Sequence, residues 1–355
     1  MQTLAPKTAS KTAIVITTIN APTKAIVHFA QGGRPRGVDL VLIGDEKSPK
    51  NFAQDGARYF SLDAQRDSGF AYGRIAPARH YARKNVGYLE AIRAGAEVIV
   101  DTDDDNIPLE SFWAPRTANL AARRVTGAGW VNVYGYFTDA PIWPRGLPLD
   151  RVREAPPPLR AAATASVYCP IQQGLANENP DVDAIYRLVL PLPIDFRDEA
   201  PVALGPGTWC PFNSQNTTSF PDAFPLLYLP YYCSFRMTDI WRSFVAQRIA
   251  HVNGWAIGFH KATVYQVRNE HNLMRDFEDE IPGYLHNEKI RAALDALALP
   301  AGTDKVPDAM RLCYRKLVDL GLVGDGELAL LDAFLADLGG LKSVPARRAK
   351  LSLTY

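Results

Sequence analysis

Four carboxylates crowd into the segment AEVIVDTDDDNIP, residues 96 to 108. They belong to Asp101, Asp103, Asp104 and Asp105. A β-branched run at residues 98 to 100 precedes them and predicts the end of a buried strand. Such carboxylates repel one another unless water or a cation neutralises them, and oxygen ligands suit Mg²⁺ or Mn²⁺, which complete their shell with waters and substrate phosphates. The segment therefore predicts a clamp for a metal-bound diphosphate, with an acidic surface turn as the alternative.

The elements that must position this cluster alternate between strand and helix patterns. Strand patterns cover residues 13–20, 38–49 and 57–63, and helical patterns cover residues 24–31 and 80–95, before the acidic strand. This order predicts an α/β fold with a doubly wound, Rossmann-like sheet and right-handed crossovers. Polar residues at successive strand ends should then collect along one edge, where ligands of open α/β sheets bind.

That edge would hold Thr17, Asn20 and Asp45 beside the acidic cluster, and we interpret it as a nucleotide site. Lys84 precedes the acidic strand in the chain and would reach a diphosphate as a point charge, or else lie on a solvated helix face. The sequence contains neither a Walker P-loop nor a GxGxxG fingerprint. These absences argue against an ordinary NTPase or dinucleotide enzyme.

Six blocks between about residues 14 and 280 resemble the STELLO family of glycosyltransferases. They are YARKNVGYLEAIRAGAEVIVDTDDDNIP, WPRGLPL, QQGLANENPDVDAIYRL, PFNSQNTTSF, RMTDIWRSFVAQRI and RNEHNLMRDFEDE. The triple aspartate and the GLANENPDVDA and DIW segments are more distantly similar to UDP-arabinopyranose mutases, also called reversibly glycosylated polypeptides. Both resemblances imply a GT-A-like nucleotide-sugar fold and a nucleotide diphosphate sugar donor. Plant STELLO proteins are Golgi membrane proteins, and we do not carry this location over.

Two of these blocks add candidates for the donor pocket. Trp143 and Arg145 could contact sugar and phosphate, because guanidinium groups suit phosphate oxygens, or they could wedge a Pro-rich loop into the core. Asp181 and Asp183 share a face if they lie on a strand, and either could cap a helix that starts near Ala184. The resemblance implies that this segment belongs to the donor pocket, and we take Asp183 as a second candidate catalytic residue.

The last blocks supply the remaining candidates. Asp239 precedes an amphipathic helix and would cap it, while the resemblance implies a carboxylate that takes the acceptor proton or orients the acceptor. Arg236, nearby in the same block, is a candidate donor contact. His271 would complete a metal shell with Asp103 and Asp105 or lie on a surface loop, since a histidine after the last sheet strand can ligate the metal in GT-A enzymes.

The composition bounds the class of protein. The 355 residues carry 39 Lys and Arg against 38 Asp and Glu, so no global field favours nucleic acid. Four dispersed cysteines indicate free thiols, and no apolar run reaches the roughly 18 residues of a membrane span. We therefore expect a cytoplasmic protein without a signal peptide or transmembrane segment. The chain divides into a catalytic domain (11–285), a helical C-terminal appendage (286–343) and a flexible tail (344–355).

These observations predict a Leloir-type hexosyl- or pentosyltransferase that depends on Mn²⁺ or Mg²⁺. It would transfer a sugar from a nucleotide diphosphate sugar, with UDP-sugar as the expected donor, to a glycan, lipid-linked or protein acceptor. A nucleotide-sugar mutase and a noncatalytic nucleotide-sugar-binding scaffold are the alternatives. The sequence leaves open the base, the sugar, the acceptor, the retaining or inverting outcome, the oligomeric state and any peripheral membrane association.

Overall fold

The computed structural model describes residues 11–159, 164–269 and 272–341. Its main-sheet strands are β1 (Thr12–Thr17), β2 (Asp39–Ile43), β3 (Ala57–Phe60), β4 (Val98–Thr102), β5 (Asn106–Pro108), β6 (Asn119–Val125), β8 (Ala165–Tyr168), β9 (Ile171–Asn177), β10 (Val202–Leu204), β12 (Asn216–Ser219) and β13 (Ile257–Gln266). Within the described residues these eleven strands form one mixed sheet in the order β3-β2-β1-β4-β12-β9-β13-β10-β6-β8, with β5 paired to β13. A separate pair joins β7 (Gly129–Trp130) to β11 (Thr208–Trp209).

The α-helices are α1 (Lys24–Gly33), α2 (Leu62–Arg66), α3 (Ala71–Ile75), α4 (Lys84–Arg93), α5 (Ala184–Val189), α6 (Thr238–Val252), α7 (Leu273–Asp295), α8 (Val306–Asp319) and α9 (Glu327–Gly340). Short 3₁₀ turns are η1 (Arg34–Arg36), η2 (Tyr81–Arg83), η3 (Glu110–Trp113), η4 (Val133–Tyr136), η5 (Pro221–Leu227), η6 (Phe235–Met237) and η7 (Thr303–Lys305). No helix of the described ranges is both long and apolar enough to cross a membrane.

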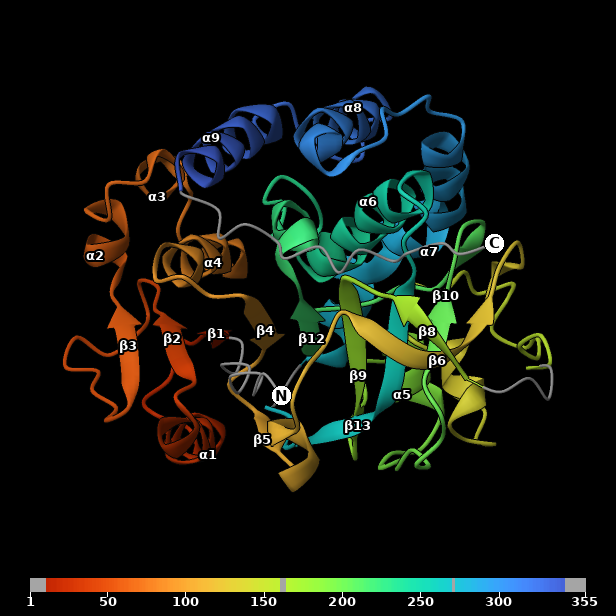
Figure 1. Cartoon of the computed structure of the whole chain (residues 1–355), viewed down its shortest axis with the longest axis horizontal. Coiled ribbons are helices and arrows are strands. Elements are labelled where there is room, and N and C mark those ends of the chain that lie inside the picture. The colour runs from red at the N-terminus through yellow and green to blue at the C-terminus, as the bar shows by residue number, and fades with distance from the viewer. Residues whose placement is uncertain (1–10, 160–163, 270–271, 342–355) are drawn as a thin grey trace, which may run out of the picture.

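The N-terminal half is the predicted parallel βαβ unit. Strands β3, β2, β1 and β4 pair in parallel, and successive apolar residues of β1 point to opposite faces. Val15 packs against α4 on one face, and Ile16 packs against α1 on the other. Figure 1 shows α1 and α4 on opposite sides of these strands. Because both faces are covered, the strands are apolar throughout and end in polar residues at one edge.

The C-terminal half mixes strand directions. Strand β12 runs antiparallel to both β4 and β9, and β13 runs parallel to β9. Helices α6, α7 and α8 lie over one side of this half in Figure 1, whereas α9 lies beside α3 above the N-terminal half. All four helices contribute to one hydrophobic core with the sheet. The structure is therefore a mixed α/β fold of the GT-A-like, Rossmann type, as predicted.

The aromatic segment at residues 127–137 contributes only the short strand Gly129–Trp130, followed by the 3₁₀ turn η4, whose Tyr134 packs into the core with Phe137. The domain boundary expected at residue 286 lies within α7, and Ile290 and Leu294 of this helix belong to the same core as α6. The expected flexible tail, residues 344–355, lies outside the described residues.

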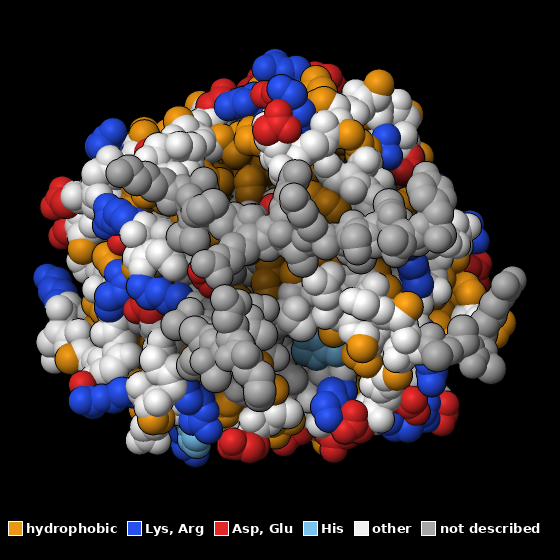
Figure 2. All heavy atoms as spheres, viewed as in Figure 1, with side chains coloured by type: hydrophobic (Ala, Val, Ile, Leu, Met, Phe, Trp, Pro, Cys, Tyr) orange, Lys and Arg blue, Asp and Glu red, His pale blue; other side chains and the backbone are white. Residues whose placement is uncertain are grey.

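Positive and negative side chains intermingle on the face shown in Figure 2, in line with the balanced charge.

Candidate active site

Three adjoining cavities follow the sheet edge at the carboxyl ends of β1, β2 and β4. The strand-end cavity, of about 320 Å³, is lined by residues 17–19, 43–47, 79–81, 83 and 235. The carboxylate cavity, of about 270 Å³, is lined by residues 17, 103–105, 145, 181, 187, 215, 235, 236, 239, 266 and 268. A smaller cavity of about 140 Å³ lies between them and shares Thr17 and Phe235 with both. Together they make one groove, so the predicted gathering of strand ends is observed.

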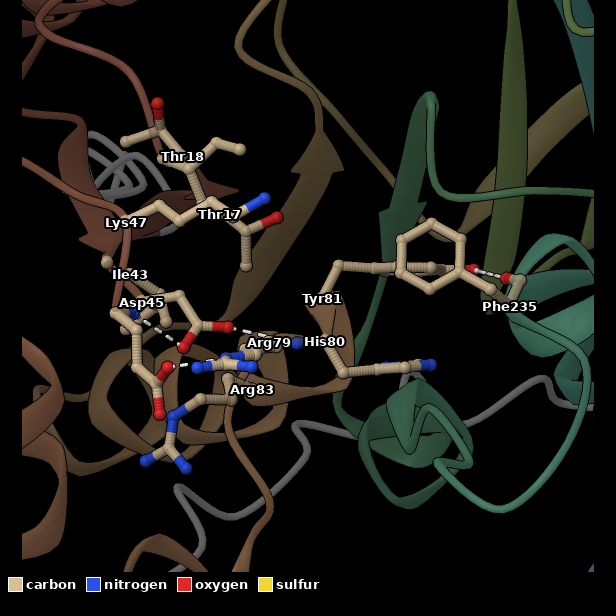
Figure 3. Close-up of a pocket in the computed structure, with 13 residues that line it drawn as sticks. Thr17, Thr18, Ile43, Asp45, Lys47, Arg79, His80, Tyr81, Arg83 and Phe235 are labelled. Atoms are coloured by element: carbon tan, nitrogen blue, oxygen red, sulfur yellow. Dashed lines mark hydrogen bonds and ion pairs between the residues drawn. The ribbon is translucent and has the colours of Figure 1, made fainter. Parts of the chain in front are cut away.

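One wall of the strand-end cavity is aromatic. The ring of Tyr81 stacks on His80 with the planes 8° apart, and Phe235 meets Tyr81 edge-on with ring centroids 5.0 Å apart. Figure 3 shows Tyr81 and Phe235 on one side of the cavity, with Thr17, Asp45 and Lys47 on the other. The Asp45 carboxylate accepts from the backbone N–H of His80 at 2.9 Å. It therefore ties the aromatic wall to the end of β2 as well as lining the cavity.

The acidic cluster is held by different partners at each position. Asp101 lies fully buried between the ammonium of Lys84 at 2.8 Å and the guanidinium of Arg242 at 2.9 Å. Asp104 accepts from the Thr18 hydroxyl at 2.6 Å and from the Asn20 amide at 3.1 Å. Asn20 thus acts on the acidic loop through Asp104. Ion pairs of Asp101 and hydrogen bonds of Asp104 therefore hold the acidic loop in place.

Lys84 does not occupy its predicted position. Its side chain is completely buried and donates to Asp101, to the Thr102 carbonyl and to Asp103 at 2.8, 2.8 and 3.2 Å. Burial lowers the pKa of Lys84, but Asp101 and Asp103 outweigh that effect and raise it above the ordinary value. The ammonium is therefore charged, and it neutralises carboxylates beneath the cavity rather than contacting a diphosphate or lying on a solvated helix face.

Asp103 and Asp105 face the carboxylate cavity. The Asp103 side chain is 39% exposed, and although Lys84 lowers its pKa, burial together with Asp105 and Asp101 raises it above the usual range. Burial also raises the pKa of Asp105, whose carboxylate accepts from the Gln266 amide at 3.0 Å. The two carboxylates thus lie in one cavity where burial opposes their charged forms.

No group of three or more His, Cys, Asp and Glu side chains forms a ready-made metal shell in the part of the chain that the structure describes. His271, the third predicted metal ligand, lies outside the described residues. The donors present nevertheless fit a hard cation, because Mg²⁺ and Mn²⁺ sites often use one or two carboxylates and complete the shell with water and substrate phosphate oxygens.

Asp239 is not the cap of α6, whose N-cap position is Met237. Its buried carboxylate accepts from Arg145 at 3.0 Å and from the backbone N–H of Ser214 at 3.1 Å. Burial alone would raise the pKa of Asp239, but Arg145 holds it well below the usual range. Arg145 also pairs with Asp181 at 2.8 Å. Asp239 is therefore a fixed carboxylate at the wall of the groove.

The remaining candidates divide between the groove and the scaffold. Arg236 lines the groove and pairs with Glu280 at 2.9 Å. Asp183 caps α5 by accepting from the Tyr186 N–H at 2.7 Å and from the Trp143 indole at 2.6 Å, and burial raises its pKa to about 6. Asp183 lines none of the three cavities described above. Asp183 therefore caps a helix outside these cavities, which was the alternative role given to it in the sequence.

Several groove residues were missing from the predicted site. They are Tyr81, Ser214, Gln215, Phe235, Gln266 and Arg268, together with Arg187 and the buried Arg242. Gln266 and Arg268 lie at the end of β13, so the rule that ligands bind at strand ends could have found them. Tyr81 and Phe235 carry no pattern of their own, because their contact depends on the fold.

Comparison with known proteins agrees with this geometry. The family of STELLO glycosyltransferases matches residues 236–345. Two Arabidopsis thaliana proteins, "Probable glycosyltransferase STELLO1" and "Probable glycosyltransferase STELLO2", are each 30% identical to this chain over 272 residues, which is 70% and 71% of this chain and 34% and 35% of theirs. The chain thus spans about a third of the length of these curated relatives. The matched region begins at Arg236 of the groove, and the chain is STELLO-like, related to the STELLO glycosyltransferases.

Proposed function

We propose that this chain is a metal-dependent glycosyltransferase that takes a sugar from a nucleotide diphosphate sugar, with UDP-sugar as the expected donor. The observation that carries the proposal is the continuous groove from the strand-end cavity to the carboxylate cavity. One end offers an aromatic wall for a nucleoside, and the other offers carboxylates for a metal-bound diphosphate. The relation to STELLO glycosyltransferases supports the same reaction class.

The metal would be held by Asp103 and Asp105, which line one cavity and whose charged forms are opposed by burial. When bound, Mn²⁺ or Mg²⁺ would neutralise the negative charge that develops on the diphosphate leaving group. His271 remains a proposed third ligand. Lys84 and Arg242 fix Asp101, so the acidic loop is held in place before any ligand arrives.

Asp239 would orient the acceptor rather than remove its proton. Arg145 keeps this carboxylate ionised and makes it a weak base, since its pKa lies far below neutral pH. Its oxygens also accept from Ser214 and Tyr81, which fixes their direction toward the groove. Asp183 has no part in this proposal, because it caps α5.

Thermal-shift measurements with a panel of nucleotide sugars, each with and without Mn²⁺, test the proposal. A matching donor should raise the melting temperature of the wild type in the presence of Mn²⁺, by mass action on the native state. Asp103→Asn should lose this Mn²⁺-dependent increment, whereas Asp63→Asn, a control whose side chain is 88% exposed, should keep it. An undiminished response in Asp103→Asn would contradict the metal clamp.

Product analysis then separates the reaction classes. Transfer to an acceptor supports the glycosyltransferase. Donor isomerisation without an acceptor would indicate a mutase, and binding without any turnover would indicate a nucleotide-sugar-binding module.

A further inference from the structure

The carboxylate cavity has a second, positive wall formed by Arg187, Arg236 and Arg268. Arg236 pairs with Glu280 at 2.9 Å, and Arg268 pairs with Asp276 at 2.8 Å. Arg187 differs from both, because none of the described carboxylates lies within ion-pair distance of it.

The Arg187 guanidinium uses little of its hydrogen-bonding capacity. One terminal nitrogen donates to the Pro180 carbonyl at 2.9 Å, and the buried Nε has no hydrogen-bond partner. Burial lowers the pKa of Arg187 to about 10, with Arg268 and Arg236 acting in the same direction and Asp181 and Glu280 in the opposite one. Arg187 thus lies beside two other cations and has no direct ion pair within the described residues. An anion that enters the cavity would relieve the repulsion and give the buried Nε a hydrogen-bond partner.

An apolar cavity continues from this wall. It has a volume of about 280 Å³, shares Arg187 and Arg268 with the carboxylate cavity, and extends over Leu190, Leu192 and Leu273. Large apolar side chains next to it in the sequence are also open to solvent, with Val189 67% and Met274 63% exposed. Apolar surface of this kind beside a charged cavity is typical of a binding site.

We infer that this end of the groove binds the acceptor, and that the acceptor is an amphiphile with a phosphate head and an apolar chain. The inference rests on the proposed function. Arg187 and Arg268 would hold the phosphate, and the chain would lie along Leu190, Leu192 and Leu273. The donor diphosphate is assigned to Asp103 and Asp105 in the same cavity, so the unused hydrogen-bonding capacity of Arg187 is available for a second anion.

The chemistry of such an acceptor matches the side chains that are present. A phosphate monoester is already ionised near neutral pH, since its second pKa is about 6. One of its oxygens would form the new bond to the anomeric carbon of the donor sugar, while the bond from that carbon to the diphosphate oxygen breaks. The products are a lipid phosphosugar and a nucleoside diphosphate, and no proton has to be removed. A fixed, weakly basic Asp239 is therefore sufficient.

The test measures binding of farnesyl phosphate, farnesol and inorganic phosphate to the full chain without donor, with donor binding measured separately. Farnesyl phosphate should bind the wild type more tightly than either of the other two probes. Arg187→Met should weaken farnesyl phosphate by about 10- to 100-fold, as expected for the loss of a charged hydrogen bond, and leave donor binding unchanged. Leu190→Gln should weaken farnesyl phosphate but not inorganic phosphate, and the exposed control Arg153→Met should change nothing.

Three results would overturn the inference. Equal affinity for farnesol would mean that only the apolar surface binds, and equal affinity for inorganic phosphate would mean that the apolar strip contributes nothing. Weaker donor binding in Arg187→Met, with farnesyl phosphate unaffected, would place Arg187 in the donor site. A wild type that binds farnesyl phosphate but no nucleotide sugar would instead reject the proposed function, which separates the two failures.

Discussion

Replacing Lys84 by methionine should destabilise the protein far more than replacing an exposed lysine. The change keeps a long unbranched side chain but removes the ammonium that bridges Asp101 and Asp103 at 2.8 and 3.2 Å. It also leaves the Thr102 carbonyl without this donor. Because the site has no solvent access at Lys84, water cannot replace the lost charge without opening the fold.

Removing one partner of a buried ion pair costs about 3 to 5 kcal/mol, since the other charge is left buried. Asp101 keeps its second partner, Arg242 at 2.9 Å, so we expect a loss near the lower limit, about 3 kcal/mol. A typical native state is stable by only about 5 to 15 kcal/mol. The Lys84→Met protein should therefore fold but unfold at a clearly lower urea concentration.

Urea unfolding at pH 7.5, followed by fluorescence, measures this difference. Lys24→Met is the matched control, because Lys24 is exposed on α1, and it should change the free energy of unfolding by less than about 0.5 kcal/mol. Donor binding in Lys84→Met should also weaken, because the acidic loop loses its fixed position. If Lys84→Met and Lys24→Met had the same stability, the buried network would not support the site as described.

The other predictions concern residues around and away from the groove. Asp239→Asn should lower the free energy of unfolding by about 3 kcal/mol, because it removes a buried charged partner of Arg145, and an unchanged urea unfolding curve would show that this pair contributes little to stability. Burial lowers the pKa of His251 to about 4, so the folded state loses stability as the pH falls from 6.5 toward 4. Between pH 7.5 and 5 the free energy of unfolding of His251→Gln should therefore fall by about 2 kcal/mol less than that of the wild type. Equal pH profiles of the two proteins in urea unfolding would refute this. Glu327→Gln should reduce both thermal stability and donor affinity, because this carboxylate accepts from the backbone N–H groups of Tyr231 and Tyr232 in the loop that leads to Phe235. Unchanged donor affinity in the thermal-shift assay would show that α9 does not support the site.

The first half of the fold could be predicted because its elements are specified locally. Strands β1, β2 and β4 contain short apolar runs, and some helix ends carry residues that suit them, such as the N-cap Thr23 of α1 and Gly95 after α4 with a φ of 86°. The rule that strand ends share an edge then placed Thr17, Asp45 and Asp103 along one groove. That step required no knowledge of which side chains contact one another in the folded chain.

The failures share a physical cause, which is burial from several sides at once. Helix α4 buries nine of its ten residues, Lys84 included, so its sequence could not show which face Lys84 occupies. In the sequence Asp239 resembles a cap, but it lies in the first turn of α6, and Arg145, 94 positions away, donates to its carboxylate. Contacts of this range depend on tertiary packing and leave no periodic pattern in the sequence.

The distribution of charge around the groove suits two different anionic groups. The cations Lys84, Arg242 and Arg145 pair with the carboxylates of Asp101, Asp103, Asp181 and Asp239, so three positive charges meet four negative ones. The carboxylate cavity also holds the Asp105 carboxylate and Arg187, for which no ion pair is seen within the described residues. In the proposed function, a metal-bound donor would offset the excess carboxylates at Asp103 and Asp105. An anionic acceptor would offset the charge of Arg187, so the two substrates would meet in the cavity that Asp239 also lines.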